Sequence, residues 1–268
     1  MMKKRMTILL TGVLALSLLT ACGGKETSEE KDRLERIQEA GELVVAMEGT
    51  WSPWTYHDDS GELVGYDVEV AAAIAEKLGV KATFVEGGWD GLLAGLESGR
   101  YDIMVNGVNV TEDRAEVYDF SEPYAYDRMA VIVRSDDERI QAMEDLKDMT
   151  TANTITSIYA AKAQEYGANV TGVDDLAQTF QLLLTERIDA TLNSHLTYLD
   201  YMSANPDSEL KVAVLSAEAD QIAIPMQKGE DTATLREAVN KAISELREDG
   251  TLTQLSIKYF GTDITSAE

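Results

Sequence analysis

Residues 43–47 read Leu-Val-Val-Ala-Met and begin the part of the chain that decides the fold. A short apolar run of this kind, bounded by polar residues, predicts a buried strand. Farther along, Val70, Ile74 and Leu78 recur every four residues, which is the spacing of one helix face. Two more strands are predicted, from apolar runs, at residues 82–85 and 103–105. This alternation of strands and helices is typical of a parallel sheet covered by helices, and so of an α/β fold.

The same order of elements returns in the second half of the chain. After an apolar run at 130–133, helices are predicted at about 158–166, 174–184 and 195–203. A longer helix follows, and its apolar residues form one stripe made of Leu235, Val239, Ile243 and Leu246. Two α/β units of similar size predict two lobes, and a ligand would lie between them at the carboxyl ends of the strands.

The N-terminus carries the features of a lipoprotein signal peptide, which we place at residues 1–21. Basic residues precede an apolar run of about 16 residues, which is shorter than the roughly 20 that a membrane-spanning helix needs. The sequence Leu-Thr-Ala-Cys at 19–22 matches the bacterial lipoprotein box, so the Cys22 thiol would carry a diacylglycerol with acyl chains such as palmitate. An ordinary secretory signal is the alternative. Residues 22–42 would then be the lipidated cysteine and a linker.

Composition argues against several classes of function. The chain of 268 residues has a net charge of −25 and no block of Lys and Arg, whereas a nucleic-acid-binding protein needs a basic face for the phosphates. Two histidines and one cysteine offer few ligands for a zinc site. The 48 Asp and Glu residues are expected to be mostly solvated surface charge. We therefore predict no catalytic residue, no metal or cofactor, and no nucleic-acid partner.

Six stretches occur in an order and spacing that point to one protein family. They are GTWSPW at 49–54, GELVGYDV at 61–68, WDGL at 89–92, VTEDR with DFSEPY at 110–124, RIDA at 187–190, and DGTL with KYFG at 249–261. Together they resemble the bacterial family 3 solute-binding proteins, which serve ABC importers of polar amino acids. The resemblance implies an extracytoplasmic binding protein that captures an amino acid or a similar small polar solute.

The resemblance also implies a fold, the two-lobe type II periplasmic-binding-protein fold, in which helices flank a mixed or parallel sheet in each lobe. The first lobe would comprise residues 43–133 and 225–262, and the second lobe would comprise 134–224. Two hinge strands would cross between the lobes near 131–135 and 221–225. The solute would be captured between the lobes, and the closed form would dock on an ABC permease. Proteins of this kind commonly work as monomers.

Arg114 is the first candidate for ligand binding, because its counterpart in the family clamps the α-carboxylate of the ligand. A guanidinium group is always charged and can donate two parallel hydrogen bonds to a carboxylate. A surface arginine paired with a neighbouring carboxylate is the alternative. In the family, the loop before this arginine also donates hydrogen bonds to the ligand, and its candidates here are Asn106, Gly107 and Asn109.

Aromatic residues are expected to enclose the ligand. Trp51 and Trp89 match family positions whose side chains flank it, and flat aromatic faces can hold an apolar stem or a cation. Trp54 is a further candidate, although a tryptophan at this position more often supports the loop or packs in the core. Glu48 stands where many relatives carry an acidic residue that contacts an amino group. An exposed loop carboxylate is the alternative for Glu48.

Two positions depart from the family pattern. A Gly-Thr-Thr-like turn at a helix start normally binds the ligand carboxylate in the second lobe, and Ser157 is the best candidate that remains there. Ser194 stands where relatives have an aspartate that pairs with the ligand's ammonium group. Serine cannot neutralise that charge, and burying an unpaired ammonium is costly. Either Glu48 takes over this role, or the ligand is not an ordinary α-amino acid.

Two other functions stay open at this point. A periplasmic dehydratase for prephenate-like acids has the same fold, and His195 or Glu48 beside Arg114 could transfer a proton. A receptor that presents its ligand to a membrane kinase or chemoreceptor would share the whole sequence pattern. Residues 189–201 look similar to cystine and polar amino-acid binders, which points to ligands of that kind.

Overall fold

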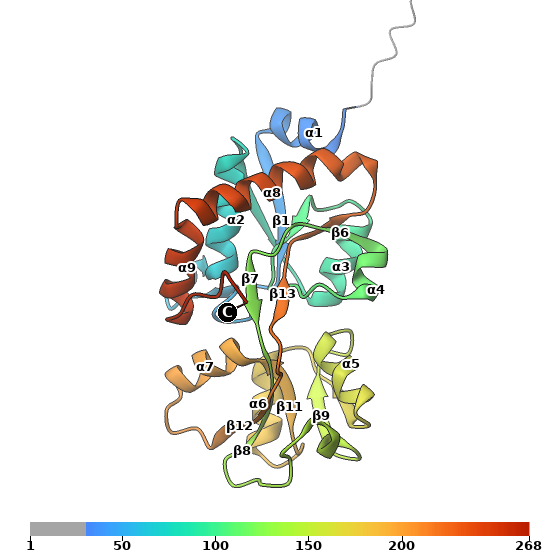
Figure 1. Cartoon of the computed structure of the whole chain (residues 1–268), viewed down its shortest axis with the longest axis vertical. Helices are drawn as coiled ribbons and strands as arrows, with labels where there is room; N and C mark the ends of the chain where they lie inside the picture. Colours follow the sequence, from blue (N-terminus) through green and yellow to red (C-terminus); the bar gives the residue numbers. More distant parts are fainter. Residues whose placement is uncertain (1–30, 268) are drawn as a thin grey trace, which may run out of the picture. The chain divides into compact units, whose positions relative to one another are not determined.

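The computed structural model describes residues 31–267 of the chain, and the predicted signal peptide with Cys22 lies outside this part. Within it, Figure 1 shows two lobes, each with its own sheet and helices. The strands β7 (Ala125–Asp127) and β13 (Asp220–Ile222) run side by side between the lobes. No helix of the described part is both long enough and apolar enough to cross a membrane.

The first helix, α1 (Arg33–Ala40), lies where the sequence predicted a linker up to residue 42. A capping box closes its start, and Ile37 is buried in the core of the first lobe. The Arg33 side chain donates a hydrogen bond of 2.6 Å to Asp102, which lies far along the chain. The linker prediction is therefore wrong for this segment, because a single buried residue in a short polar helix gives no clear periodicity.

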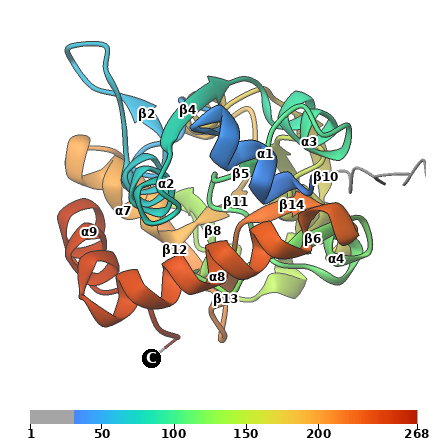
Figure 2. The same cartoon turned by 90° about the horizontal axis from the view of Figure 1, so that it is seen from above.

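The first lobe is built on a parallel sheet in the order β4-β1-β5. Its strands are β1 (Glu42–Met47), β4 (Lys81–Glu86) and β5 (Ile103–Met104). Its other helices are α2 (Tyr66–Lys77), α3 (Trp89–Glu97), α4 (Glu112–Val117), α8 (Ala233–Glu248) and α9 (Thr251–Phe260). The predicted strands are confirmed, and the apolar stripe of α8 is buried in the core of this lobe. Figure 2 shows α8 crossing the lobe next to α1 and α2.

The second lobe has an antiparallel sheet in the order β11-β8-β12, and a bridge between Thr151 and Ala190 links it to the parallel pair β9-β10. Its strands are β8 (Met129–Arg134), β9 (Thr150–Asn153), β10 (Asn169–Gly172), β11 (Thr191–Ser194) and β12 (Leu210–Leu215). The predicted helices are present as α5 (Ile158–Glu165), α6 (Leu176–Leu184) and α7 (His195–Ala204). The first lobe also has the short strands β2 (Tyr56–His57), β3 (Leu63–Val64), β6 (Tyr118–Phe120) and β14 (Pro225–Gln227). One 3₁₀ turn lies in the second lobe, at Met143–Leu146, and another in the first lobe, at Glu230–Thr232.

The boundary between the lobes lies earlier in the chain than the sequence predicted. The first hinge strand was expected near 131–135, whereas β7 is the strand that pairs with β13 between the lobes. The strand β13 overlaps the second expected hinge at 221–225. The strand β8 is instead central in the sheet of the second lobe, and its apolar residues pack in that lobe's core. An apolar run predicts a strand, but it does not show which of two sheets the strand joins. We propose 31–127 and 220–267 as the first lobe and 128–219 as the second.

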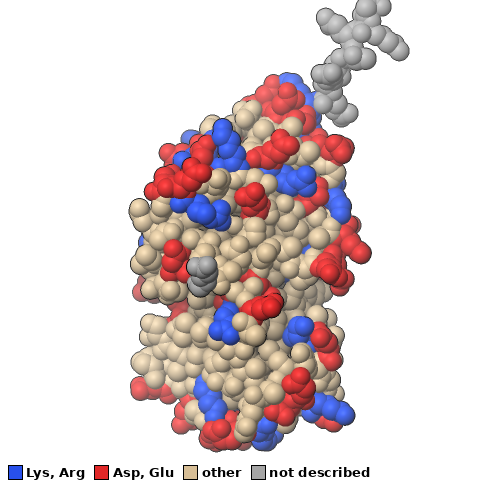
Figure 3. Space-filling model, in the orientation of Figure 1, with Lys and Arg blue, Asp and Glu red and all other residues tan. Residues whose placement is uncertain are grey.

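Charged side chains of both signs lie on the surface, although acidic residues outnumber basic ones in the sequence, 48 to 23. On the face shown in Figure 3, acidic and basic groups are intermixed toward the two ends, and the middle of the face is mostly uncharged. Exposed ion pairs, such as Arg36 with Asp231 and Lys77 with Asp249, join some of these groups. Such pairs are solvated and contribute little to stability.

Candidate functional site

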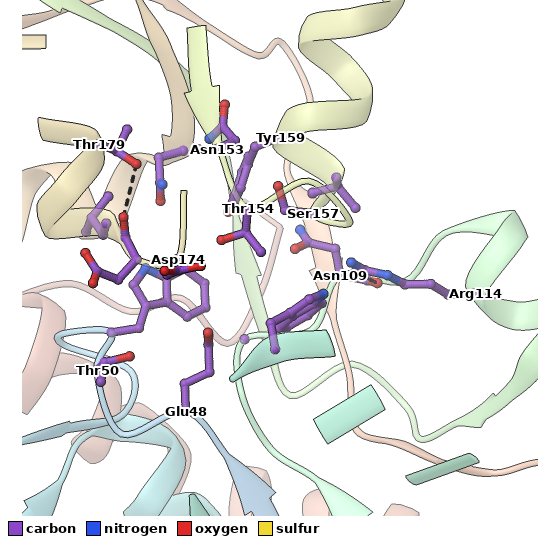
Figure 4. Close-up of a pocket in the computed structure, with 17 residues that line it drawn as sticks. Glu48, Thr50, Asn109, Arg114, Asn153, Thr154, Ser157, Tyr159, Asp174 and Thr179 are labelled. Carbon is purple, nitrogen blue, oxygen red and sulfur yellow. Dashed lines mark hydrogen bonds between the residues drawn. The ribbon is translucent and has the colours of Figure 1, made fainter. Parts of the chain in front are cut away.

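A pocket within the described residues is lined from both lobes (Figure 4). Seven of the ten predicted ligand-binding residues line it, namely Glu48, Trp51, Trp89, Gly107, Asn109, Arg114 and Ser157. The remaining lining residues were not predicted as site residues from the sequence. They are Thr50, Asn153, Thr154, Ile158, Tyr159, Asp174, Asp175, Leu176, Thr179 and Asn193. Three predicted residues do not line the pocket, namely Trp54, Asn106 and Ser194.

Arg114 presents a half-buried guanidinium group to this pocket from α4 (Glu112–Val117), whose N-cap is Thr111. Its Cζ lies 5.0 Å from the centroid of the Trp89 ring, and its Nη1 donates to the Asn109 carbonyl at 3.1 Å. Burial lowers the pKa of Arg114, but a guanidinium keeps its charge in proteins. No carboxylate of the described part pairs with it. Its remaining donors are therefore available to an anionic group in the pocket.

Tryptophan rings form two of the pocket's surfaces. Trp51 lines the pocket and stacks on Trp54, with ring centroids 5.7 Å apart. Trp54 is fully buried, and its ring centroid lies 4.9 Å from that of Phe260. The structure therefore places Trp54 in the core behind Trp51, whereas it was a candidate for the pocket. A large ring in this position packs against other core rings, because the loop around it folds over the first lobe. Trp89 supplies the second surface, beneath Arg114.

Glu48 lines the pocket, and Asn106 holds it there. The Oδ1 of Asn106 accepts from the Glu48 N–H at 2.8 Å, and its Nδ2 donates to Oε2 of Glu48 at 2.8 Å. Asn106 is fully buried and supports Glu48. It was predicted to contact the ligand, but it does not line the pocket. Burial raises the pKa of Glu48, the hydrogen bond from Asn106 opposes this rise, and the charge of Asp90 adds to it. A cation brought by a ligand would stabilise the charged carboxylate.

Gly107 shapes the pocket through its backbone. Its φ is +54°, and a Cβ there would lie 2.6 Å from Cζ3 of Trp51, so a larger residue would displace the ring. The Gly107 N–H donates to Oδ2 of Asp67 at 2.6 Å, and the Tyr124 hydroxyl donates to Oδ1 at 2.7 Å. Asp67 is fully buried and anchors this loop. Sequence reasoning missed it, because an acidic residue in the first turn of a helix usually faces solvent.

The second lobe contributes polar groups at the ends of β9 and α5. Ser157 is the N-cap of α5, and its Oγ accepts from the Ala160 N–H at 3.2 Å. Asn153 is 3% exposed, and its Nδ2 donates to the Leu192 carbonyl at 2.7 Å. The Oδ1 of Asn153 is buried without a hydrogen-bond partner within residues 31–267. An unsatisfied buried acceptor is costly, and an N–H donor from a ligand would remove that cost.

Two carboxylates at the start of α6 also line the pocket. The side chain of Asp175 caps this helix by accepting from the Gln178 N–H at 2.9 Å. Asp174 is exposed, and in Figure 4 it lies on the opposite side of the pocket from Arg114. In the sequence they read only as capping residues before a helix, so no signal marked them as part of a site. With Glu48 they give the pocket three carboxylates against one guanidinium.

Ser194 is the N-cap of α7, and it is fully buried. Its Oγ accepts from the Thr197 N–H at 3.1 Å, and its hydroxyl donates to the carboxylate of Asp127. The structure therefore places Ser194 behind the pocket wall and not in it, while its neighbour Asn193 lines the pocket. A small side chain that caps a helix between two buried partners has no room to turn outward.

His195, the predicted alternative proton donor, begins α7 outside the pocket. Its ring stacks on Tyr198, with centroids 6.5 Å apart. Burial lowers the pKa of His195, and the positive charge of Arg128 adds to this effect. Both effects disfavour the charged imidazolium, and His195 is not among the residues that line the pocket with Arg114.

Comparison with known proteins gives a consistent set of relatives. The family described as bacterial extracellular solute-binding proteins, family 3, matches residues 43–262. A "Probable amino-acid ABC transporter-binding protein" of Haemophilus influenzae is 40% identical over 259 residues, which cover 97% of each chain. The L-cystine-binding protein TcyA of Bacillus subtilis is 38% identical over 269 residues, which cover 98% of this chain and 99% of TcyA. The solved structure of an ancestral arginine-binding protein bound to arginine has a TM-score of 0.77 at 33% identity, over 82% of this chain and 99% of that one.

Proposed function

We propose a ligand for this chain from one premise: the chain belongs to the bacterial extracellular solute-binding proteins, family 3. Its likeness to the ancestral arginine-binding protein confirms the predicted two-lobe type II periplasmic-binding-protein fold. The family acts outside the cytoplasm, and relatives over the whole length are named as binding proteins of amino-acid ABC transporters. The function that follows is capture of an amino acid in the pocket between the lobes, for delivery to an ABC permease.

The observation that carries this proposal is the half-buried guanidinium of Arg114, which has no carboxylate partner in the described part of the chain. It faces a pocket, it lies over Trp89, and a backbone carbonyl is its one protein acceptor within the described part. A cation that is partly removed from water loses some of its solvation, so a carboxylate from a ligand would be favoured beside it. The α-carboxylate of an amino acid supplies the planar pair of oxygens that a guanidinium binds.

The opposite end of the pocket supports a ligand that also carries positive or donor groups. Glu48, Asp174 and Asp175 lie away from any ion pair with a described lysine or arginine. Trp51 offers a flat face to the part of the ligand between its charged groups. A zwitterionic amino acid with a polar side chain matches this arrangement. The names of the relatives make L-cystine and L-arginine the first compounds to test.

Calorimetry on Arg114 variants tests the proposal. Arg114→Ala removes two charge-assisted hydrogen bonds from the complex and is expected to weaken amino-acid binding by roughly a hundredfold or more. Arg114→Lys keeps the positive charge but cannot donate two parallel hydrogen bonds to a carboxylate, so an intermediate loss of affinity is expected. The matched control is Arg100→Ala, an exposed arginine of the same lobe. If Arg114→Ala binds as tightly as the wild type, the carboxylate clamp is refuted.

Three finer statements belong to this proposal. The chain binds its ligand and does not convert it, which is supported by the position of His195 outside the pocket. Cys22 anchors the protein to the membrane through its lipid, which is supported by the sequence of residues 19–22. The protein works as a monomer that meets the permease in its ligand-bound form. Incubation with prephenate-like acids tests the first statement, because turnover would contradict it.

A further inference from the structure

A buried carboxylate, Asp127, lies next to Ser194 and has no cationic partner in the described part of the chain. Asp127 is 7% exposed, and it accepts from the Ser194 hydroxyl and from the N–H groups of Arg128 and Leu196. The Arg128 side chain donates instead to the Ser216 carbonyl. Burial raises the pKa of Asp127 to about 6. The protein alone therefore leaves this negative charge uncompensated.

A second carboxylate increases the negative potential at this place. Asp220 stands directly opposite Asp127 in the ladder of β13 and β7. Like charges that face each other across two strands destabilise the pair. Burial raises the pKa of Asp220, and the positive charge of Lys162 lowers it. At Asp127, no lysine or arginine charge lowers the pKa. The two hinge strands thus carry a charge pair that an additional cation would stabilise.

The strand register places Asp127 next to Ser194, behind the wall of the pocket. Ser194 pairs with Met129 in the ladder of β11 and β8, so Asp127 comes just before that pair, at the edge of the sheet where β11 ends. The strand β9 packs beside β11 and ends at the same edge with Asn153. Asn153 and Asn193 both line the pocket, and the Oδ1 of Asn153 has no partner within residues 31–267. An unused acceptor therefore lies at one end of the pocket, and the uncompensated charge of Asp127 lies behind that end.

Tyr159 and Arg114 line the same pocket. In Figure 4, Tyr159 lies among the second-lobe residues of the wall. Burial raises the pKa of Tyr159, the charges of Asp127 and Asp220 raise it further, and Arg114 lowers it. The two charged groups of an α-amino acid are attached to one carbon, so they need opposite charges that are close together.

We propose that Asp127 supplies the negative charge that compensates the α-ammonium group of the bound amino acid, while Oδ1 of Asn153 accepts a hydrogen bond from it directly. This inference rests on the proposed function and names the partner of the ligand's second charged group. It places the carboxylate on the hinge strand β7 rather than at residue 194. It leaves Glu48 and Asp174 to the side chain of the ligand, at the other end of the pocket.

A comparison of ligands with and without the ammonium group tests this assignment. The probes are L-cystine with dithiodipropionic acid, and L-arginine with guanidinovaleric acid, since each acid is the amino acid without its α-ammonium. Asp127→Asn is expected to weaken binding of the amino acids by roughly ten- to a hundredfold, which is the loss of one charge-assisted contact. Binding of the acids should change no more than it does in Asp136→Asn, an exposed control in the second lobe.

A double variant tests whether the negative charge itself is needed for binding, because affinity would not recover if Asp127 were only a structural residue. Asp127→Ser with Ser194→Asp moves the carboxylate across an existing hydrogen bond, and aspartate is as good an N-cap for α7 as serine. This variant should recover most of the amino-acid affinity that Asp127→Ser alone loses. Urea unfolding of each variant shows that it is folded.

The remaining outcomes overturn the assignment. Equal weakening of amino acids and acids by Asp127→Asn would make Asp127 a structural residue of the hinge. A selective loss in Glu48→Gln, with none in Asp127→Asn, would place the ammonium at Glu48. If neither probe amino acid binds the wild type, the proposed function fails together with this inference. If Arg114→Ala weakens binding but Asp127→Asn does not, only this inference fails.

Discussion

Replacing Asp67 by asparagine is expected to make the stability of this protein less dependent on pH. Asp67 is fully buried, and its two oxygens accept from the Tyr124 hydroxyl at 2.7 Å and from the Gly107 N–H at 2.6 Å. Burial raises its pKa from 3.8 to about 7, although both hydrogen bonds oppose the rise. An asparagine can accept from Gly107 and donate to the Tyr124 oxygen, so the loop beside the pocket should keep its position.

The magnitude follows from the difference in proton binding between the folded and the unfolded chain. Between pH 3.8 and about 7, the folded protein keeps a proton on Asp67 that the unfolded chain has lost. The stability from Asp67 is therefore fully present below its unfolded pKa, and it is lost as the pH rises through the folded pKa. Each pH unit in this window lowers the free energy of unfolding by at most about 1.4 kcal/mol. Over the window, the loss is at most about 4 kcal/mol.

Urea unfolding of the wild type and of Asp67→Asn, at several values between about pH 4 and about pH 8, measures this effect. The difference between their free energies of unfolding should shift in favour of the variant as the pH rises to about 7, and then stay constant. Asp249→Asn is the control, because its carboxyl is exposed and its pKa is lowered to about 2, below the measured range. A difference between wild type and Asp67→Asn that does not change with pH would refute the reasoning. It would mean that the two hydrogen bonds outweigh burial and keep Asp67 charged.

The other predictions concern the pocket, the first helix and the anchor. Gly107→Ala should weaken ligand binding at least tenfold in calorimetry, because φ of +54° and the nearby Trp51 ring exclude a Cβ; unchanged affinity would contradict the aromatic wall. Arg33→Ala should lower the free energy of unfolding by about 3 kcal/mol in urea, since it leaves Asp102 buried without its cation; a loss like that of an exposed arginine would show that α1 is not fixed to the lobe. Cys22→Ser should move the protein from washed membranes to the soluble fraction, and continued association would contradict the lipid anchor.

The local structure could be read from the sequence because it depends on neighbours in the chain. The strand at 43–47 and the apolar stripe of α8 are confirmed, since each buries one face of a regular element and so leaves a period in the sequence. Arg114 could be predicted as a site residue because it lies in a sequence motif of the family. The prediction that failed for α1, and the boundary that moved at β8, both concern which distant surface an element packs against. Periodicity carries no information about that.

By itself, the sequence determined the α/β class, the family, the net charge and a short set of polar and aromatic candidates for the site. Only the tertiary structure decided which of them face the pocket. Asn106 turned out to hold Glu48, and Ser194 turned out to hydrogen-bond to Asp127 behind the wall. These pairs join residues far apart in the chain, and the charge of a buried group depends on such partners and on its distance from water. For that reason a missing carboxylate at position 194 could be seen in the sequence, whereas the carboxylate beside it at Asp127 could be found only in the fold.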